Sequence, residues 1–214
     1  MRFACTMLLY VLCNSSAWAS SLLVTVTDSE GNRLEHAVIS IHGKVSQMAT
    51  GDAALAVMDQ RERQFAPSVL PIQQGTKVSF PNSDDVRHHV YSFSYPNNFE
   101  LKLYHGEKNK PISFDEPGIV VLGCNIHDGM IGYLQVVDTP WFSKTEIDGL
   151  ASIDQIPGGN YTLQVWHPDL GMNYEHQKIT LTEGHQAITV RLPTGQRAQT
   201  PKPEVSPLQA LFDD

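Results

Sequence analysis

The stretch Gly123-Cys124-Asn125-Ile126-His127-Asp128-Gly129-Met130 places a thiol, an imidazole and a thioether within seven residues. These side chains can surround one ion only if the segment folds into a tight loop, and Gly129 gives that loop backbone freedom. Such a loop cannot also supply a fourth ligand, so another imidazole must come from a different strand. His88 and His89 are the candidates, and the place of His88 between a polar loop and a predicted strand favours it.

Two His, one Cys and a weakly bound Met form the ligand set of blue-copper electron-transfer sites. Soft sulfur ligands select copper, and imidazole suits both of its oxidation states. The chain therefore predicts a site for one copper ion. The predicted metal ligands are His88, Cys124, His127 and Met130.

The first nineteen residues have the pattern of a secretory signal peptide. A short positive region precedes an apolar segment, and Ala17-Trp18-Ala19 is a small-x-small cleavage site. We expect cleavage after Ala19 and export to the periplasm. Cys5 and Cys13 would leave with this segment, so Cys124 would have no disulfide partner. Metal ligation or burial explains an unpaired thiol in an oxidising compartment, and the neighbouring imidazole and thioether favour ligation.

The charge of the chain limits its partners. The formal net charge is -8, and removal of the first nineteen residues, whose one charged side chain is Arg2, makes it -9. An acidic exported protein is a poor ligand for nucleic acid or an anionic membrane, and it suits a basic protein partner. No segment after the signal approaches about 18 consecutive apolar residues, so no membrane span is expected.

The secondary-structure signals predict an all-β protein. β-Branched runs and alternating segments such as 77–80 and 99–104 are separated by Gly, Pro and Asn turns. A continuous apolar run at 119–122 predicts a buried strand, with Cys124 just past its end. The sequence has no sustained 3.6-residue period, so sandwich-type units are expected.

The residues around the candidate site resemble those of the cupredoxin family. The resemblance is carried by Phe80-Pro81-Asn82, Asp84, His88-His89-Val90, Gly123-Cys124, His127 and Met130. The spacing Cys-x-x-His-x-x-Met is similar to that of amicyanin in the plastocyanin-like group. The pattern also looks like the bacterial cupredoxin-type proteins labelled methylamine utilization proteins. The resemblance implies a Greek-key β-sandwich in which His88, Cys124 and His127 are equatorial copper ligands and Met130 is the axial ligand.

The chain departs from the cupredoxin pattern at one position. Cupredoxins usually carry Asn after the first ligand His, and this chain has His89 there. The identity of the first ligand, His88 or His89, therefore stays open. The match to His-Asn-Val and strand alternation favour His88. Asp84 and Asp85 could support a copper ligand from behind or be loop residues, and loop and capping roles are favoured.

The segments that flank the candidate domain resemble the carboxypeptidase-regulatory-like β-sandwich, at residues 24–38 and 149–163. One small sandwich could be assembled from both ends of the chain, or the N-terminal part could be a separate hairpin. The expected divisions are a signal peptide (1–19), an N-terminal β unit (20–55), a cupredoxin domain (56–138), a carboxypeptidase-regulatory-like β-sandwich (139–193) and a disordered tail (194–214).

The resemblance implies a periplasmic carrier of single electrons with no catalytic reaction of its own. Its partner would be a redox protein such as a dehydrogenase or a cytochrome. A copper-binding or trafficking protein is a second hypothesis, and a β-sandwich binding module with a structural metal site is a third. The sequence shows no Ser-His-Asp order, phosphate-binding Gly-rich loop or paired-carboxylate pattern.

Overall fold

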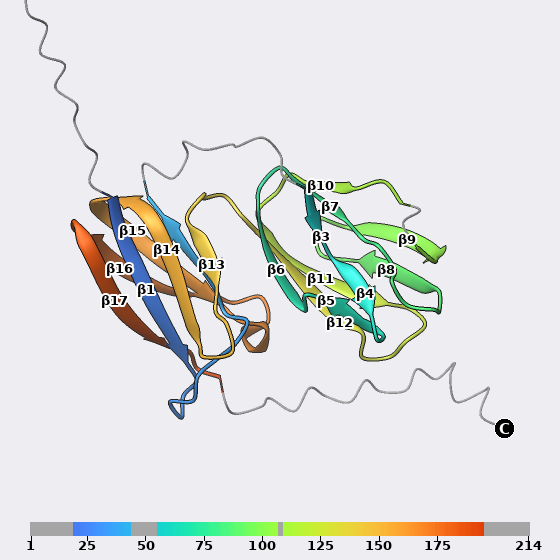
Figure 1. Ribbon diagram of the computed structural model, residues 1–214, viewed down its shortest axis with the longest axis horizontal. Coiled ribbons are helices and arrows are strands. Elements are labelled where there is room, and N and C mark those ends of the chain that lie inside the picture. The colour runs from blue at the N-terminus through green and yellow to red at the C-terminus, as the bar shows by residue number, and fades with distance from the viewer. Residues whose placement is uncertain (1–18, 44–54, 107–108, 195–214) are drawn as a thin grey trace, which may run out of the picture.

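The computed structural model describes residues 19–43, 55–106 and 109–194. The predicted signal peptide up to residue 18 and the predicted tail after Thr194 lie outside the described residues. Within them the regular structure is β-strand apart from one short 3-10 helix, Pro168–Leu170, so the chain is all-β, as predicted. None of the helical structure in these ranges is long and apolar enough to cross a membrane. Two β-sandwiches lie side by side (Figure 1).

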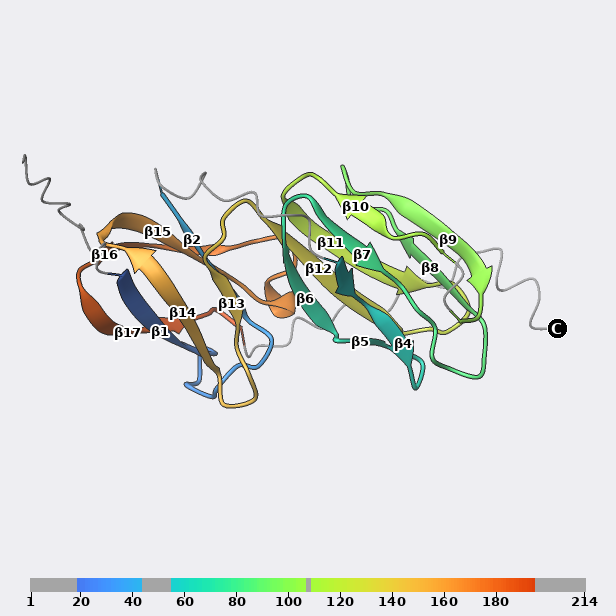
Figure 2. The ribbon, with the colours of Figure 1, turned by 45° about the horizontal axis from the view of Figure 1, so that its top comes forward.

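The first sandwich is built from both ends of the chain (Figures 1 and 2). Its strands are β1 (Ala19–Thr27), β2 (Val38–His42), β13 (Phe142–Lys144), β14 (Leu150–Pro157), β15 (Gly159–Trp166), β16 (Glu175–Leu181) and β17 (Gly184–Arg191). They form a three-stranded sheet in the order β14-β1-β17 and a four-stranded sheet in the order β13-β2-β15-β16. β1 and β2 therefore lie in different sheets and do not form a hairpin with each other.

The residues that join these two sheets follow the period of two that strands impose. In β1, Leu22, Val24 and Val26 are buried, while Leu23 between them is exposed. The buried residues meet apolar side chains of both sheets in one continuous core. β1 is paired on both sides, antiparallel with β14 and parallel with β17. The N-terminal strand is thus a central element of a sandwich whose other strands come mostly from the far end of the chain.

The second sandwich is cupredoxin-like and lies between β2 and β13 in the chain. Its strands are β3 (Leu55–Val57), β4 (Asp59–Arg61), β5 (Gln64–Ala66), β6 (Val69–Gln73), β7 (Thr76–Ser79), β8 (His88–Ser92), β9 (Phe99–Tyr104), β10 (Ile112–Phe114), β11 (Gly118–Cys124) and β12 (Ile131–Val137). A five-stranded sheet, β6-β12-β11-β8-β9, faces a three-stranded sheet, β10-β7-β3, and β4 and β5 form a hairpin.

Strand alternation in this sandwich directs two candidate ligands inward. His88 and Val90 of β8 are buried, as are Leu122 and Cys124 of β11. Cys124 is the last residue of β11, so the prediction that it lies past the strand was wrong. The strand is longer because Cys124 pairs with Val90 across the β8–β11 ladder. The side chains of Val90 and Cys124 therefore enter the same apolar core.

A third apolar cluster joins the two sandwiches. Val38 and Trp166 from the first sandwich are buried against Val69 and Ile119 from the second. The ring of Tyr133 packs edge-on against Trp166 with centroids 5.5 Å apart. Trp166 has no exposed surface, and its indole N–H donates to the Gly171 carbonyl at 2.7 Å. The indole therefore closes the interface and stays hydrogen-bonded inside it.

Trp166→Ala tests the energetic contribution of this interface. Removal of a fully buried indole leaves a cavity and an unpaired Gly171 carbonyl, so the free energy of unfolding should fall by about 3–5 kcal/mol. Urea unfolding followed by far-UV circular dichroism measures the change. Tyr95→Ala is the control, because this aromatic residue is 93% exposed and should change stability by less than about 0.5 kcal/mol. Equal effects of the two variants would contradict a stabilising role for the interface.

Candidate metal centre

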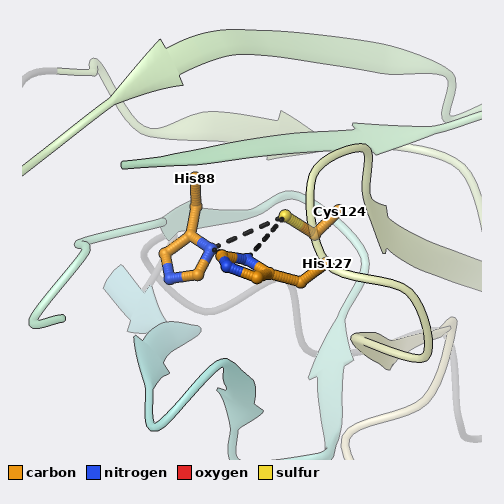
Figure 3. A group of neighbouring side chains, drawn as sticks. All are labelled: His88, Cys124 and His127. Atoms are coloured by element: carbon orange, nitrogen blue, oxygen red, sulfur yellow. Dashed lines mark hydrogen bonds between the residues drawn. The ribbon is translucent and has the colours of Figure 1, made fainter. Parts of the chain in front are cut away.

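Three side chains converge at one end of the second sandwich: His88, Cys124 and His127 (Figure 3). The Sγ atom of Cys124 lies 3.5 Å from Nδ1 of His88 and 3.8 Å from Nδ1 of His127. The two Nδ1 atoms are 3.1 Å apart. The three atoms thus form a compact triangle of two nitrogens and one sulfur.

The size of this triangle fits a transition-metal ion. A point equally far from its three corners lies about 2 Å from each, close to the lengths of metal–nitrogen and metal–sulfur bonds in proteins. Imidazole and thiolate are also the ligand types that bind copper and zinc. The arrangement of the side chains in this chain therefore suits such an ion without movement of the backbone.

The strands bring the first two of these residues together. His88 begins β8, and Val90 two residues later lies directly opposite Cys124 of β11. Because side chains two apart on a strand share a face, His88 points into the core beside Cys124. His89 points to the other face, where its Nε2 atom lies 2.9 Å from a carboxylate oxygen of Glu100. The structure thus places His88 in the cluster and His89 outside it.

The third residue comes from the loop after β11. The Met130 amide donates to the His127 carbonyl at 3.2 Å, which closes a four-residue turn. Gly129 occupies its third position with φ of 79°, a conformation that glycine adopts without steric cost. The loop is also tied to β8, because the Asn125 amide donates to the His89 carbonyl. This fold returns the half-buried His127 ring to Cys124.

Met130, the remaining predicted ligand, is the last residue of this turn. It is 3% exposed and belongs to the same apolar core as Cys124. It also lines a surface hollow of about 640 Å³, which His127 and Arg63 border. Met130 therefore ends the turn that carries His127, and its side chain is almost fully buried.

Asp84 contacts the cluster, whereas sequence reasoning favoured a loop or capping role for it over a contact with a copper ligand. Its Oδ2 atom accepts a hydrogen bond from Nε2 of His88 at 2.7 Å. Desolvation by itself would raise the pKa of Asp84, but hydrogen bonds from the Arg63 amide, the His88 ring and the Glu62 amide lower the pKa overall. A carboxylate four residues before a candidate ligand was the available signal, because ligating histidines usually donate their second ring N–H to such a group.

The loop between β7 and β8 is held by a buried amide. Asn82 donates through Nδ2 to the carbonyls of Val86 and Tyr104, both at 2.9 Å. The Tyr104 hydroxyl in turn donates to the Phe80 carbonyl at 2.6 Å. Burial raises the pKa of Tyr104 to about 12, so the hydroxyl keeps its proton and remains a donor at neutral pH. These bonds connect the loop that carries Asp84 to β9.

Comparison with known proteins gives matches among solved structures only. No protein-family model and no curated protein matches the chain. Solved cupredoxin-type structures match part of it at low identity. One is the Cu-containing nitrite reductase (NirK) from Thermus scotoductus SA-01, with 26% identity over 42% of this chain and a TM-score of 0.38. The match spans 25% of that enzyme's chain.

Two smaller proteins are matched over nearly their whole length. The purple cupredoxin from Nitrosopumilus maritimus has 21% identity and a TM-score of 0.35, over 39% of this chain and 99% of its own. A point mutant of amicyanin in its oxidized state has 18% identity and a TM-score of 0.36, over 46% of this chain and 98% of its own. These matched proteins are of the class that the sequence motifs resemble.

The adjacent histidines provide a test of the cluster. His88→Ala removes one corner of the triangle, so Cu(II) binding should weaken strongly and any visible thiolate-to-copper band should be lost. His89→Ala is the matched control and should keep both, because its ring faces Glu100. Titration with Cu(II), followed by visible absorption, distinguishes the two variants. The reverse result would move the ligand to His89.

Proposed function

We propose that this chain is a periplasmic type 1 copper protein that carries single electrons. The observation that supports this proposal is the triangle of His88, Cys124 and His127 donor atoms at the end of a β-sandwich. Two imidazoles and one thiolate are the equatorial ligand set of blue-copper sites, in which a long thioether contact is the usual axial ligand. In this proposal Met130 provides the thioether.

Copper would supply the electron by cycling between its two oxidation states. The protein would contribute by holding its donors still, because ligand movement between the states slows electron transfer. Strand ladders hold His88 and Cys124, and a hydrogen-bonded turn holds His127. The apolar core around Cys124 and Met130 excludes water from the sulfur side of the site.

His127 would lie on the side of the site that faces a partner protein. It is half-buried and borders the 640 Å³ hollow, whose rim carries the exposed apolar residues Ile126 and Ile131. We propose that a redox protein such as a dehydrogenase or a cytochrome docks here, and that the chain performs no substrate chemistry of its own. Export through the predicted signal peptide would place both proteins in the periplasm.

Cys124→Ser tests the proposal directly. The oxidised wild-type protein should show an intense visible band from thiolate-to-copper charge transfer, and the serine variant should lack it because an alkoxide or hydroxyl is not a comparable donor. Visible absorption after addition of Cu(II) measures both. Wild-type protein loaded with Zn(II) is the control, since a d¹⁰ ion gives no such band. A wild-type protein that binds copper without the band would favour copper storage or trafficking.

Met130→Leu tests the axial position. The variant should keep copper and the visible band but have a higher reduction potential, because loss of thioether donation and a drier pocket both disfavour the higher charge of Cu(II). Leu is close to Met in volume, so packing should cost less than about 1.5 kcal/mol.

Protein-film voltammetry measures the change. Met172→Leu makes the same substitution at a residue that is 59% exposed and should leave the potential unchanged. An unchanged or lowered potential in Met130→Leu would mean that Met130 is only a core residue.

A further inference from the structure

One carboxylate outside the predicted ligand set is bonded to the cluster. Asp84 Oδ2 lies 2.7 Å from Nε2 of His88, on the side of the ring opposite to Cys124. The side chain of His88 has no exposed surface, and that of Asp84 is 12% exposed. Water therefore competes little for this hydrogen bond. The bond sets the rotation of the imidazole ring and favours the proton on Nε2.

Asp84 is itself fixed by a hairpin from another part of the sandwich. Its two carboxylate oxygens accept hydrogen bonds from the amides of Glu62 at 2.6 Å and Arg63 at 2.9 Å. These two residues join β4 to β5 with φ of 52° and 60°. Positive φ at both positions is the signature of the tight hairpin turn that leaves two amides directed outward. The turn therefore offers a pair of donors to one carboxylate.

The hairpin and the loop are also joined by their backbones. The Ser83 amide donates to the Gln60 carbonyl at 3.0 Å, and the Asp84 amide donates to Oδ1 of Asn82 at 3.1 Å. The carboxylate thus has little freedom to move away from His88. A continuous path of hydrogen bonds leads from the β4–β5 turn through Asp84 to the imidazole.

We propose that Asp84 is a positioning residue of the copper site, which holds His88 with Nδ1 toward the metal and stabilises Cu(II) through its negative charge. This inference rests on the proposed copper-binding function. A hydrogen-bonded carboxylate makes the imidazole a stronger donor, and outer groups of this kind typically contribute about 10- to 100-fold to metal affinity. The β4–β5 hairpin is then a support for the metal site.

The adjacent histidine provides a matched control. His89 also bonds a carboxylate through Nε2, at 2.9 Å from Glu100. The Glu100 side chain is 55% exposed, and the His89 ring lies outside the cluster. Glu100→Gln therefore removes the same charge and weakens the same type of hydrogen bond, at the neighbouring histidine, without touching a proposed ligand.

The experiment compares Asp84→Asn with Glu100→Gln and wild type. Affinity for Cu(II) is measured by competition with a chelator, and reduction potential by voltammetry. Asp84→Asn should raise the Cu(II) dissociation constant about 10- to 100-fold and make the potential more positive. Glu100→Gln should change neither, since an exposed charge is screened by solvent and salt.

Several results would overturn the inference. Asp84→Asn could match wild type in affinity and potential, or both variants could shift the potential equally, which would indicate only long-range charge. A loss of stability in the metal-free Asp84→Asn protein with unchanged affinity and potential would indicate a purely structural role. In each case a wild-type visible band would leave the proposed function intact, whereas absence of that band in wild type would overturn both proposals.

Asp84→Glu is the second test variant, to be used if the Asp84→Asn protein does not fold. It keeps the charge and both acceptors but is longer by one methylene, which displaces the carboxylate relative to the His88 ring. We expect a weaker Cu(II) affinity than in wild type, with a potential closer to wild type than to that of a variant lacking the charge. Unchanged affinity in Asp84→Glu would contradict a positioning role.

Discussion

The close approach of three donor atoms at the edge of an apolar core is the constraint on which this structure depends. Two imidazole nitrogens and a sulfur lie within 3.8 Å of one another, and buried polar atoms need partners. With the proton on Nε2 donated to Asp84, the Nδ1 atom of His88 presents a lone pair toward the other two atoms. In the proposed function, a metal cation would accept all three lone pairs and so give each of these atoms a partner.

The rest of the second sandwich can be understood as the means of keeping these atoms together. The β8–β11 ladder sets Val90 opposite Cys124, and the period of two then places His88 on the same inner face. The turn closed by Met130 returns His127 to the cluster. Around them, apolar residues of both sheets form a core that limits the access of water. Each donor thus belongs to an element that is fixed by other contacts.

The hairpin and the first sandwich extend this support beyond the site. Two turn amides hold Asp84, which holds the ring of His88, so part of the rigidity of the centre originates in β4 and β5. The first sandwich packs through Trp166 against the second. The proposed single-electron carrier would gain from such rigidity, because little reorganisation would accompany each change of charge. The half-buried His127 lies nearer the surface than the buried His88 and Cys124.

Local spacing in the sequence was enough to predict that Cys124 and His127 would meet, because they lie three residues apart and Gly129 permits the turn. Strand alternation also favoured His88 over His89, and the structure places His88 in the cluster. A contact of Asp84 with a copper ligand was considered but not favoured, because its geometry depends on a hairpin about twenty residues earlier in the chain. The position of β1 between β14 and β17 was likewise decided by tertiary structure, since backbone pairing between distant segments leaves no local pattern in either of them.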